Sequence, residues 1–160
     1  GEIIRLSHEK GCRVVFNASP IPKNPEELPL ELVDIFMVNE LEAAALAGTS
    51  AEGDFRDILK ALQKKYPKAA IVMTLGKDGV LYGYKEEFYS HPIFKVNAVD
   101  TTAAGDTFCG YFLAALCAGK SVEMALREAS AASAMAVSAK GAAPSIPVHS
   151  AVEEWLCGRS

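Results

Sequence analysis

A run of small residues between two carboxylates has the clearest potential for chemistry: Asp100-Thr101-Thr102-Ala103-Ala104-Gly105-Asp106. We predict a short strand at 96–99 before it and an apolar helix from about 105 to 118 after it. The first amides of a helix have no intrahelical acceptor and lie at the positive end of the helix dipole, so the backbone at 103–105 is suited to receive phosphate oxygens. Asp106 would repel a phosphate, but it suits a general base for a hydroxyl that attacks phosphorus. These two features together indicate phosphoryl transfer.

A structural explanation of this segment stays open. Asp or Thr before a helix is often only an N-cap, and small residues at a helix start often only permit close packing. The sequence also lacks a Walker-type P-loop: the glycines at 105 and 110 are followed by Tyr111, and Gly119-Lys120-Ser121 has no upstream glycine. No G-x-G-x-x-G, G-x-S-x-G or H-E-x-x-H motif occurs either.

Strand-like and helical runs alternate along the chain, which predicts a single α/β domain with a three-layer, mostly parallel sheet. The predicted strands are 12–16, 35–38 and 69–74, with antiparallel edge strands at 80–84 and 87–90, and the predicted helices are 40–47, 51–65, 105–118 and 121–138. The prolines of residues 17–29 exclude regular structure there. The last two helices are apolar nearly all round, so we expect them to be buried.

The composition limits the partners. Half of the 160 residues are apolar, the net charge is −4 and the isoelectric point is about 5.4, which disfavours nucleic acid and anionic membranes and favours small molecules. The four cysteines have no C-x-x-C spacing, so we expect neither a disulfide framework nor a zinc site, and reduced cytoplasm as the location. The longest apolar run, residues 112–118, is too short to span a membrane.

The 100–106 segment resembles the D-T-x-G/A-A-G-D signature of the ribokinase-like, or PfkB, carbohydrate kinases. Further similar segments follow in the family's order: Phe16-Asn17-Ala18-Ser19-Pro20, Asn39-Glu40-Leu41-Glu42, Thr74-Leu75-Gly76-Lys77-Asp78-Gly79 and Lys140-Gly141-Ala142-Ala143-Pro144-Ser145-Ile146-Pro147. The form A-A-G-D-T-F is closest to the ribokinase members. The resemblance covers essentially the whole chain and implies the C-terminal half of a ribokinase-like fold, without the N-terminal half and its lid.

The resemblance implies three groups of site residues. Catalysis would use Asp106 as the base and the amides of Ala103, Ala104 and Gly105 as an anion hole. Nucleotide binding would involve Asn39, Thr74, Gly76, Lys77, Gly79, Gly105 and Ser130. Metal ions would be held by Asn39 and Glu42 (Mg²⁺, partly through water) and by Asp100, Thr102, Ala136, Ala139, Gly141 and Ser145 (K⁺). Three of these segments also have a purely structural interpretation. Residues 39–42 can be a helix capping box, residues 74–79 a hairpin turn and residues 136–145 a loop that ends a helix.

The implied activity of the complete enzyme is ATP-dependent phosphorylation of a sugar primary hydroxyl, with ribose giving ribose 5-phosphate, and with Mg²⁺ and K⁺ as cofactors. Fructokinase-type and adenosine kinase-type substrates remain alternatives. In this family the sugar is held mainly by the N-terminal half, and the lid allows a homodimer, so this fragment alone should be weakly active or inactive. A non-catalytic module that pairs through an exposed sheet edge is the alternative of a different class. We expect His8, His91 and His149 at the surface, and Cys109 and Cys117 in the packing of a buried helix.

Overall fold

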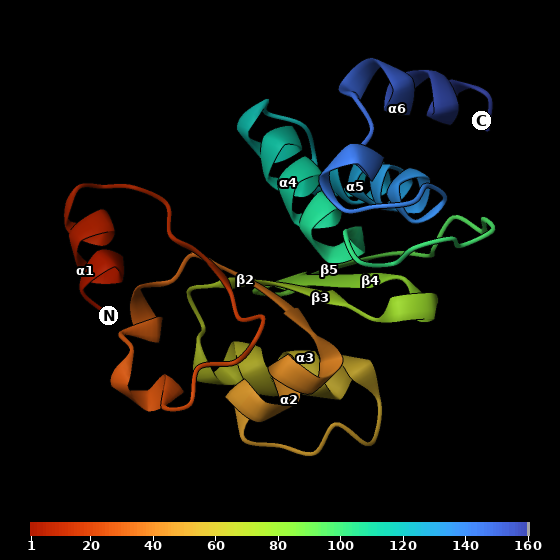
Figure 1. Ribbon diagram of the computed structural model, residues 1–160. Helices are drawn as coiled ribbons and strands as arrows, with labels where there is room; N and C mark the ends of the chain where they lie inside the picture. Colours follow the sequence, from red (N-terminus) through yellow and green to blue (C-terminus); the bar gives the residue numbers. More distant parts are fainter. Residues whose placement is uncertain (160) are drawn as a thin grey trace. The chain divides into compact units, whose positions relative to one another are not determined.

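The computed structural model describes residues 1–159, which form two compact units (Figure 1). The first unit comprises Gly1–Gly76 and Leu81–Tyr89, and the second comprises Lys77–Val80 and the chain from Ser90 onward. Each unit has its own hydrophobic cluster. Within the described residues, none of the helices combines the length and the apolar character that a membrane span requires.

The first unit holds nearly all of a five-stranded sheet with the order β1-β2-β3-β4-β5. Its elements are α1 (Glu2–Glu9), β1 (Val15–Asn17), η1 (Pro25–Glu27), η2 (Leu30–Leu32), β2 (Ile35–Asn39), α2 (Glu40–Ala47), α3 (Phe55–Lys65), β3 (Ala70–Thr74), β4 (Val80–Tyr84) and β5 (Glu87–His91). Strands β1, β2 and β3 are parallel, and Asn39 lies opposite Thr74 in the register. Only two residues connect β4 to β5, so these strands are antiparallel, as the sequence predicted.

The central strands β2 and β3 are buried on both faces, which explains why they are continuous apolar runs. One face packs against an apolar stripe of α3 that consists of Ile58, Leu59 and Leu62. Alternate side chains of both strands are buried on the two faces: Phe36, Val38, Ile71 and Met73 on this one, and Ile35, Met37, Ala70 and Val72 on the other. The expected α/β core is therefore present.

The second unit consists mainly of helices: α4 (Ala104–Cys117), α5 (Val122–Val137), η4 (Ala143–Ser145) and α6 (His149–Cys157). A short helix, η3 (Gly76–Asp78), precedes β4. Helix α5 begins where the sequence predicted, because the Ser121 side chain accepts a hydrogen bond from the Met124 amide. Its buried positions are mostly alanines, which allow α4 and α5 to pack closely.

Three boundary predictions need correction. Helix α3 begins at Phe55, not at residue 51, because the Asp54 side chain accepts from the Arg56 amide at 2.7 Å and caps the helix there. Strand β1 begins at Val15, not at residue 12; the Val14 amide just before it donates to the Asp34 carboxylate at 2.7 Å. The segment 17–29 is not wholly irregular, since η1 lies within it and begins at a proline, a residue that the first turn of a helix accepts.

Three other expectations were wrong in the second unit. Residues 96–99 form no strand; the amides of Val99 and Asp100 instead donate to the Val137 carbonyl, at 2.7 and 3.2 Å. Helix α4 is not buried all round, because its buried residues are confined to one stripe of Thr107, Phe108, Phe112 and Ala115. Cys117 is exposed. Much of the remaining surface of α4 is glycine and alanine, whose small side chains leave little apolar area to bury.

Candidate active site

Helix α4 begins without a side-chain cap. Its N-cap residue is Ala103, and no side chain accepts from the first amides of the helix. The structural alternative for the 100–106 segment, an Asp or Thr N-cap, is therefore absent here. A Cβ added at Gly105 would meet nothing within 4 Å, so open space lies beside the first turn. No capping side chain therefore competes with an anion for the amides at the start of α4.

Asp106 is the third residue of α4, and its side chain is exposed. The start of the helix is fixed from α5, because the Ser133 hydroxyl donates to the Ala104 carbonyl at 3.0 Å. The Ala104 amide donates to the Thr101 carbonyl at 3.2 Å, so one member of the predicted anion hole is already engaged within the turn. The Thr107 hydroxyl is buried and has no hydrogen-bond partner among the described residues. Neither Ser133 nor Thr107 was predicted as part of the site.

The carboxylate of Asp100 joins the segment before α4 to the loop after α5. One oxygen accepts from the Thr102 hydroxyl at 2.6 Å and from the Thr102 amide at 3.0 Å, and the other accepts from the Gly141 amide at 3.1 Å. These bonds favour the charged form, and the Thr102 hydroxyl contributes most, so the pKa of Asp100 lies below its ordinary value. Asp100, Thr102 and Gly141 of the predicted K⁺ group are thus brought together.

The other members of that group lie in the loop that ends α5. The Ala139 amide donates to the Ala136 carbonyl at 3.1 Å, and both the hydroxyl and the amide of Ser145 donate to the Ala142 carbonyl. The loop therefore satisfies much of its own bonding, as the structural alternative requires. Within residues 1–159 no group of three or more His, Cys, Asp or Glu side chains is arranged to hold a metal. A site here would depend on backbone carbonyls and the single carboxylate of Asp100.

In the first unit, Asn39 and Glu42 form a complete capping box at the start of α2. The Glu42 amide donates to Asn39 Oδ1 at 2.8 Å, and the Asn39 amide donates to Glu42 Oε2 at 2.9 Å. Glu42 is buried to 8% exposure. Thr74 lies beside Asn39 at the carboxyl ends of the two parallel strands, and its hydroxyl donates to the Val38 carbonyl at 3.4 Å. The structure thus groups Asn39, Glu42 and Thr74 at one edge of the sheet, where ligands of open α/β sheets bind.

The turn before β4 contains the other predicted nucleotide residues. Gly76 and Gly79 have φ values of +53° and +96°, and Lys77 between them is exposed. A Cβ at Gly79 would lie 2.2 Å from the His91 carbonyl oxygen, so glycine is required there for packing alone. Ser130 is half-buried on α5. Roles of these residues toward a nucleotide stay predictions.

The chain is similar to known sugar kinases. The model of the pfkB family carbohydrate kinases matches residues 2–149. A ribokinase of Haemophilus influenzae is 38% identical over 154 residues, which cover 95% of this chain and 50% of that protein. The crystal structure of a ribokinase from Thermotoga maritima matches with a TM-score of 0.83 and 34% identity, over 95% of this chain and 52% of that one.

A ribokinase of Arabidopsis thaliana, whose structure is a complex with ribose and ATP, matches with a TM-score of 0.83 and 32% identity, over 97% of this chain and 51% of that one. The chain therefore spans about half the length of the relatives it matches. The likeness confirms the predicted ribokinase-like α/β fold. Because the family match extends over nearly all of the sequence, the chain belongs to the pfkB family of carbohydrate kinases.

Proposed function

We propose that the whole protein transfers the γ-phosphoryl group of ATP to a primary hydroxyl of a sugar, with ribose as the favoured acceptor. The observation that carries the proposal is the uncapped start of α4, with open space at Gly105 and an exposed carboxylate at Asp106. The family and the relative that was solved with ribose and ATP support the choice of substrates.

In this proposal Asp106 accepts the proton of the sugar hydroxyl as its oxygen bonds to phosphorus and the bond from phosphorus to the departing ADP oxygen breaks. Negative charge gathers on the equatorial phosphoryl oxygens. The amides at the start of α4 are fixed by the helix and stabilise that charge without reorganising. Since the Ala104 amide is held by Thr101, the main donors would be the amides at Gly105 and its neighbours that have no acceptor in the helix.

Two metal ions belong to the proposal. Mg²⁺ prefers oxygen ligands and keeps several waters, so Glu42 and Asn39 would hold it partly through water while it neutralises phosphate charge. The capping box is compatible with this role, because it uses Glu42 Oε2 and leaves acceptor capacity on the carboxylate. K⁺ would bind carbonyls of the 136–145 loop together with Asp100, whose carboxylate accepts three bonds and is held in its charged form. There it would brace the start of α4.

The test is steady-state phosphorylation by the whole protein, with ribose, 2-deoxyribose, fructose and adenosine as acceptors. The key variant is Asp106→Asn, and the control is Glu123→Gln, an exposed carboxylate in the first turn of the neighbouring helix α5. Loss of a general base should lower kcat by about 10²- to 10⁴-fold with little change in the KM for ATP, while the control keeps its rate. Retained turnover in Asp106→Asn would refute the role of this base. A preference for fructose or adenosine would move the protein to another branch of the family.

A further inference from the structure

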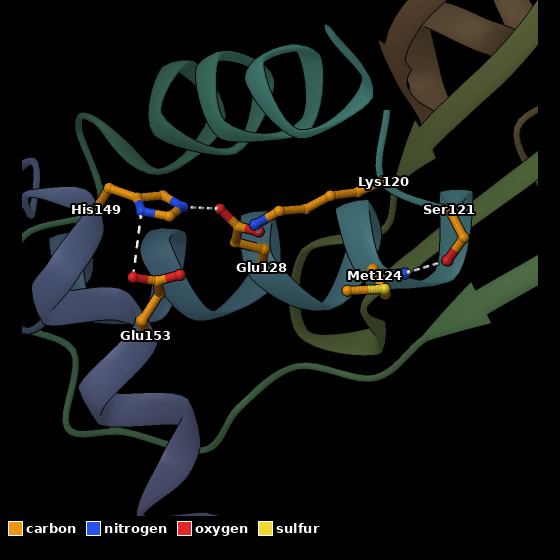
Figure 2. Close-up of polar contacts among 6 residues, drawn as sticks. All are labelled: Lys120, Ser121, Met124, Glu128, His149 and Glu153. Carbon is orange, nitrogen blue, oxygen red and sulfur yellow. Dashed lines mark hydrogen bonds and ion pairs between the residues drawn. The ribbon is translucent and has the colours of Figure 1, made fainter. Parts of the chain in front are cut away.

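A buried carboxylate in the second unit has no part in the proposed chemistry. Glu128 lies on α5 among alanines and is 7% exposed. A buried charge is costly unless it is paired and hydrogen-bonded. Figure 2 shows both of its oxygens engaged: Lys120 Nζ lies 2.5 Å from Oε2, and His149 Nε2 lies 2.7 Å from Oε1.

These partners come from different segments of the second unit. Lys120 precedes α5, and His149 is the first residue of α6. The other ring nitrogen of His149 faces the Glu153 carboxylate at 3.5 Å, one turn along α6 (Figure 2). His149 was expected at the surface, and its side chain is indeed 52% exposed, but its ring also lies between two carboxylates. The first turn of α6 is thus tied to the buried face of α5.

A second contact fixes the residues just before α6. The ring of Tyr111 on α4 stacks on the His149 ring, with centroids 6.4 Å apart and planes 9° apart. The Tyr111 hydroxyl donates to the Pro147 carbonyl at 2.6 Å. Burial and, to a smaller degree, the Glu128 charge raise the pKa of Tyr111, which keeps the hydroxyl a donor. Helices α4 and α5 together therefore hold the end of the loop that connects α5 to α6.

The same loop is held at its other end by Asp100, which accepts from the Gly141 amide at 3.1 Å. Of the proposed K⁺ group, Ser145 lies between these two anchors, Gly141 is itself one of them, and Ala139 lies two residues before it. Their carbonyls can form a cation site only if the loop keeps one conformation. A break at either anchor should therefore loosen the geometry of the whole loop.

We propose that Lys120, Glu128 and His149 form a charge latch that holds the first turn of α6 and, through it, the loop 138–148. Glu128 is then a positioning residue that acts on the loop without touching nucleotide or sugar. The consequence for cation response rests on the function proposed above, whereas the ordering of the loop does not.

The direct test measures hydrogen exchange of the Gly141 amide in the protein and in three variants. Glu128→Gln removes the buried charge but keeps an acceptor of the same shape. His149→Ala removes the half-exposed partner and leaves the interior of α5 intact. Glu153→Gln is the matched control, since it alters the exposed carboxylate on the same imidazole. Exchange of the Ala129 amide in the middle of α5 reports whether the helices remain folded.

Loss of a hydrogen bond to a charged group should raise exchange at Gly141 by about tenfold or more in Glu128→Gln and His149→Ala, with Ala129 unchanged. Glu153→Gln should stay within about twofold of the parent, as expected for an exposed ion pair. Unchanged exchange at Gly141 in His149→Ala would overturn the latch, even if Glu128→Gln were to unfold.

A functional measurement separates positioning from a general loss of stability. In the whole protein, His149→Ala should raise the half-saturating K⁺ concentration by about threefold or more, a change of RT ln 3, while the KM for ATP stays constant. A parallel fall in every kinetic parameter would contradict a positioning role. If the parent protein does not respond to K⁺ but the exchange results hold, the proposed cation site fails and the latch stands.

Discussion

Replacement of Gly79 by alanine gives a sharp test of the turn before β4. The backbone there has φ +96°, and an added Cβ would lie 2.2 Å from the His91 carbonyl oxygen and 2.9 Å from the Pro92 Cα. Both neighbours are backbone atoms, so no side chain can rotate away. Gly76, three residues earlier, also has a positive φ of +53°, but a Cβ there would meet nothing within 4 Å. The two glycines thus form a matched pair: both have a positive φ, but only at Gly79 would an added Cβ clash with neighbouring backbone atoms.

The magnitude follows from these two geometries. A left-handed backbone costs an L-residue about 1–2 kcal/mol, and forcing extra atoms into a packed position costs about 1–3 kcal/mol. Alanine recovers about 0.5–1 kcal/mol by restricting the unfolded chain. Gly79→Ala should therefore lower the free energy of unfolding by about 2–4 kcal/mol. Gly76→Ala incurs only the cost of a left-handed backbone and no clash, so it should lower the free energy of unfolding by about 1 kcal/mol or less.

Urea unfolding followed by far-UV circular dichroism measures the difference. With an m-value of about 2 kcal/mol/M, a gap of about 2 kcal/mol between the variants separates their midpoints by about 1 M. Equal midpoints for Gly76→Ala and Gly79→Ala would show that the close approach to the His91 carbonyl does not exist. The result also bears on function, because weak ATP binding by Gly79→Ala would then reflect a distorted turn and would not by itself show a nucleotide contact.

Two further predictions concern side chains that bond to backbone amides. Asn39→Ala should lower the free energy of unfolding by about 1 kcal/mol, because the Glu42 amide loses its acceptor, whereas Asn39→Asp still caps and should stay close to the parent in the same urea assay. The pKa of Asp100 is lowered by its bonds to Thr102 and Gly141, so the stability that these bonds contribute is present above the ordinary pKa of 3.8 and is lost as the pH falls through the lower value of the folded protein. The NMR shift of the Gly141 amide should accordingly titrate below pH 3.8, and a titration unchanged by Asp100→Asn would contradict this assignment.

The elements that the sequence predicted well carry their signals within a few neighbouring residues. The bounds of α2 were right at both ends, because Asn39 and Glu42 specify its start and Gly48, at φ +74°, ends it. Strands β2 and β3 were right because a doubly buried strand is a continuous apolar run. The resemblance to the family added roles for residues such as Asp106, which local pattern alone left open.

The errors arose where a distant residue decides the local structure. The segment 96–99 has the composition of a strand, but the Val99 amide bonds to the carbonyl of Val137, which a local pattern cannot reveal. The contact between Glu128 and His149 was not predicted for the same reason, since the sequence indicated only that His149 lies at the surface. Only the packing of α6 on α5 brings them within 2.7 Å.

The other helices show how far the missing cap on α4 is unusual. Helices α2, α3 and α5 each have a side chain that accepts from their first turn, whereas α4 has none. Helices α1 and α6 also begin without a side-chain cap, so the missing cap alone does not indicate a ligand. What distinguishes α4 is the combination of open space at Gly105, an acidic side chain at Asp106 and a first turn fixed by Ser133. In the proposed function this anchor would keep the backbone donors of the first turn aimed at the phosphoryl charge, since fixed donors stabilise a developing charge without reorganising.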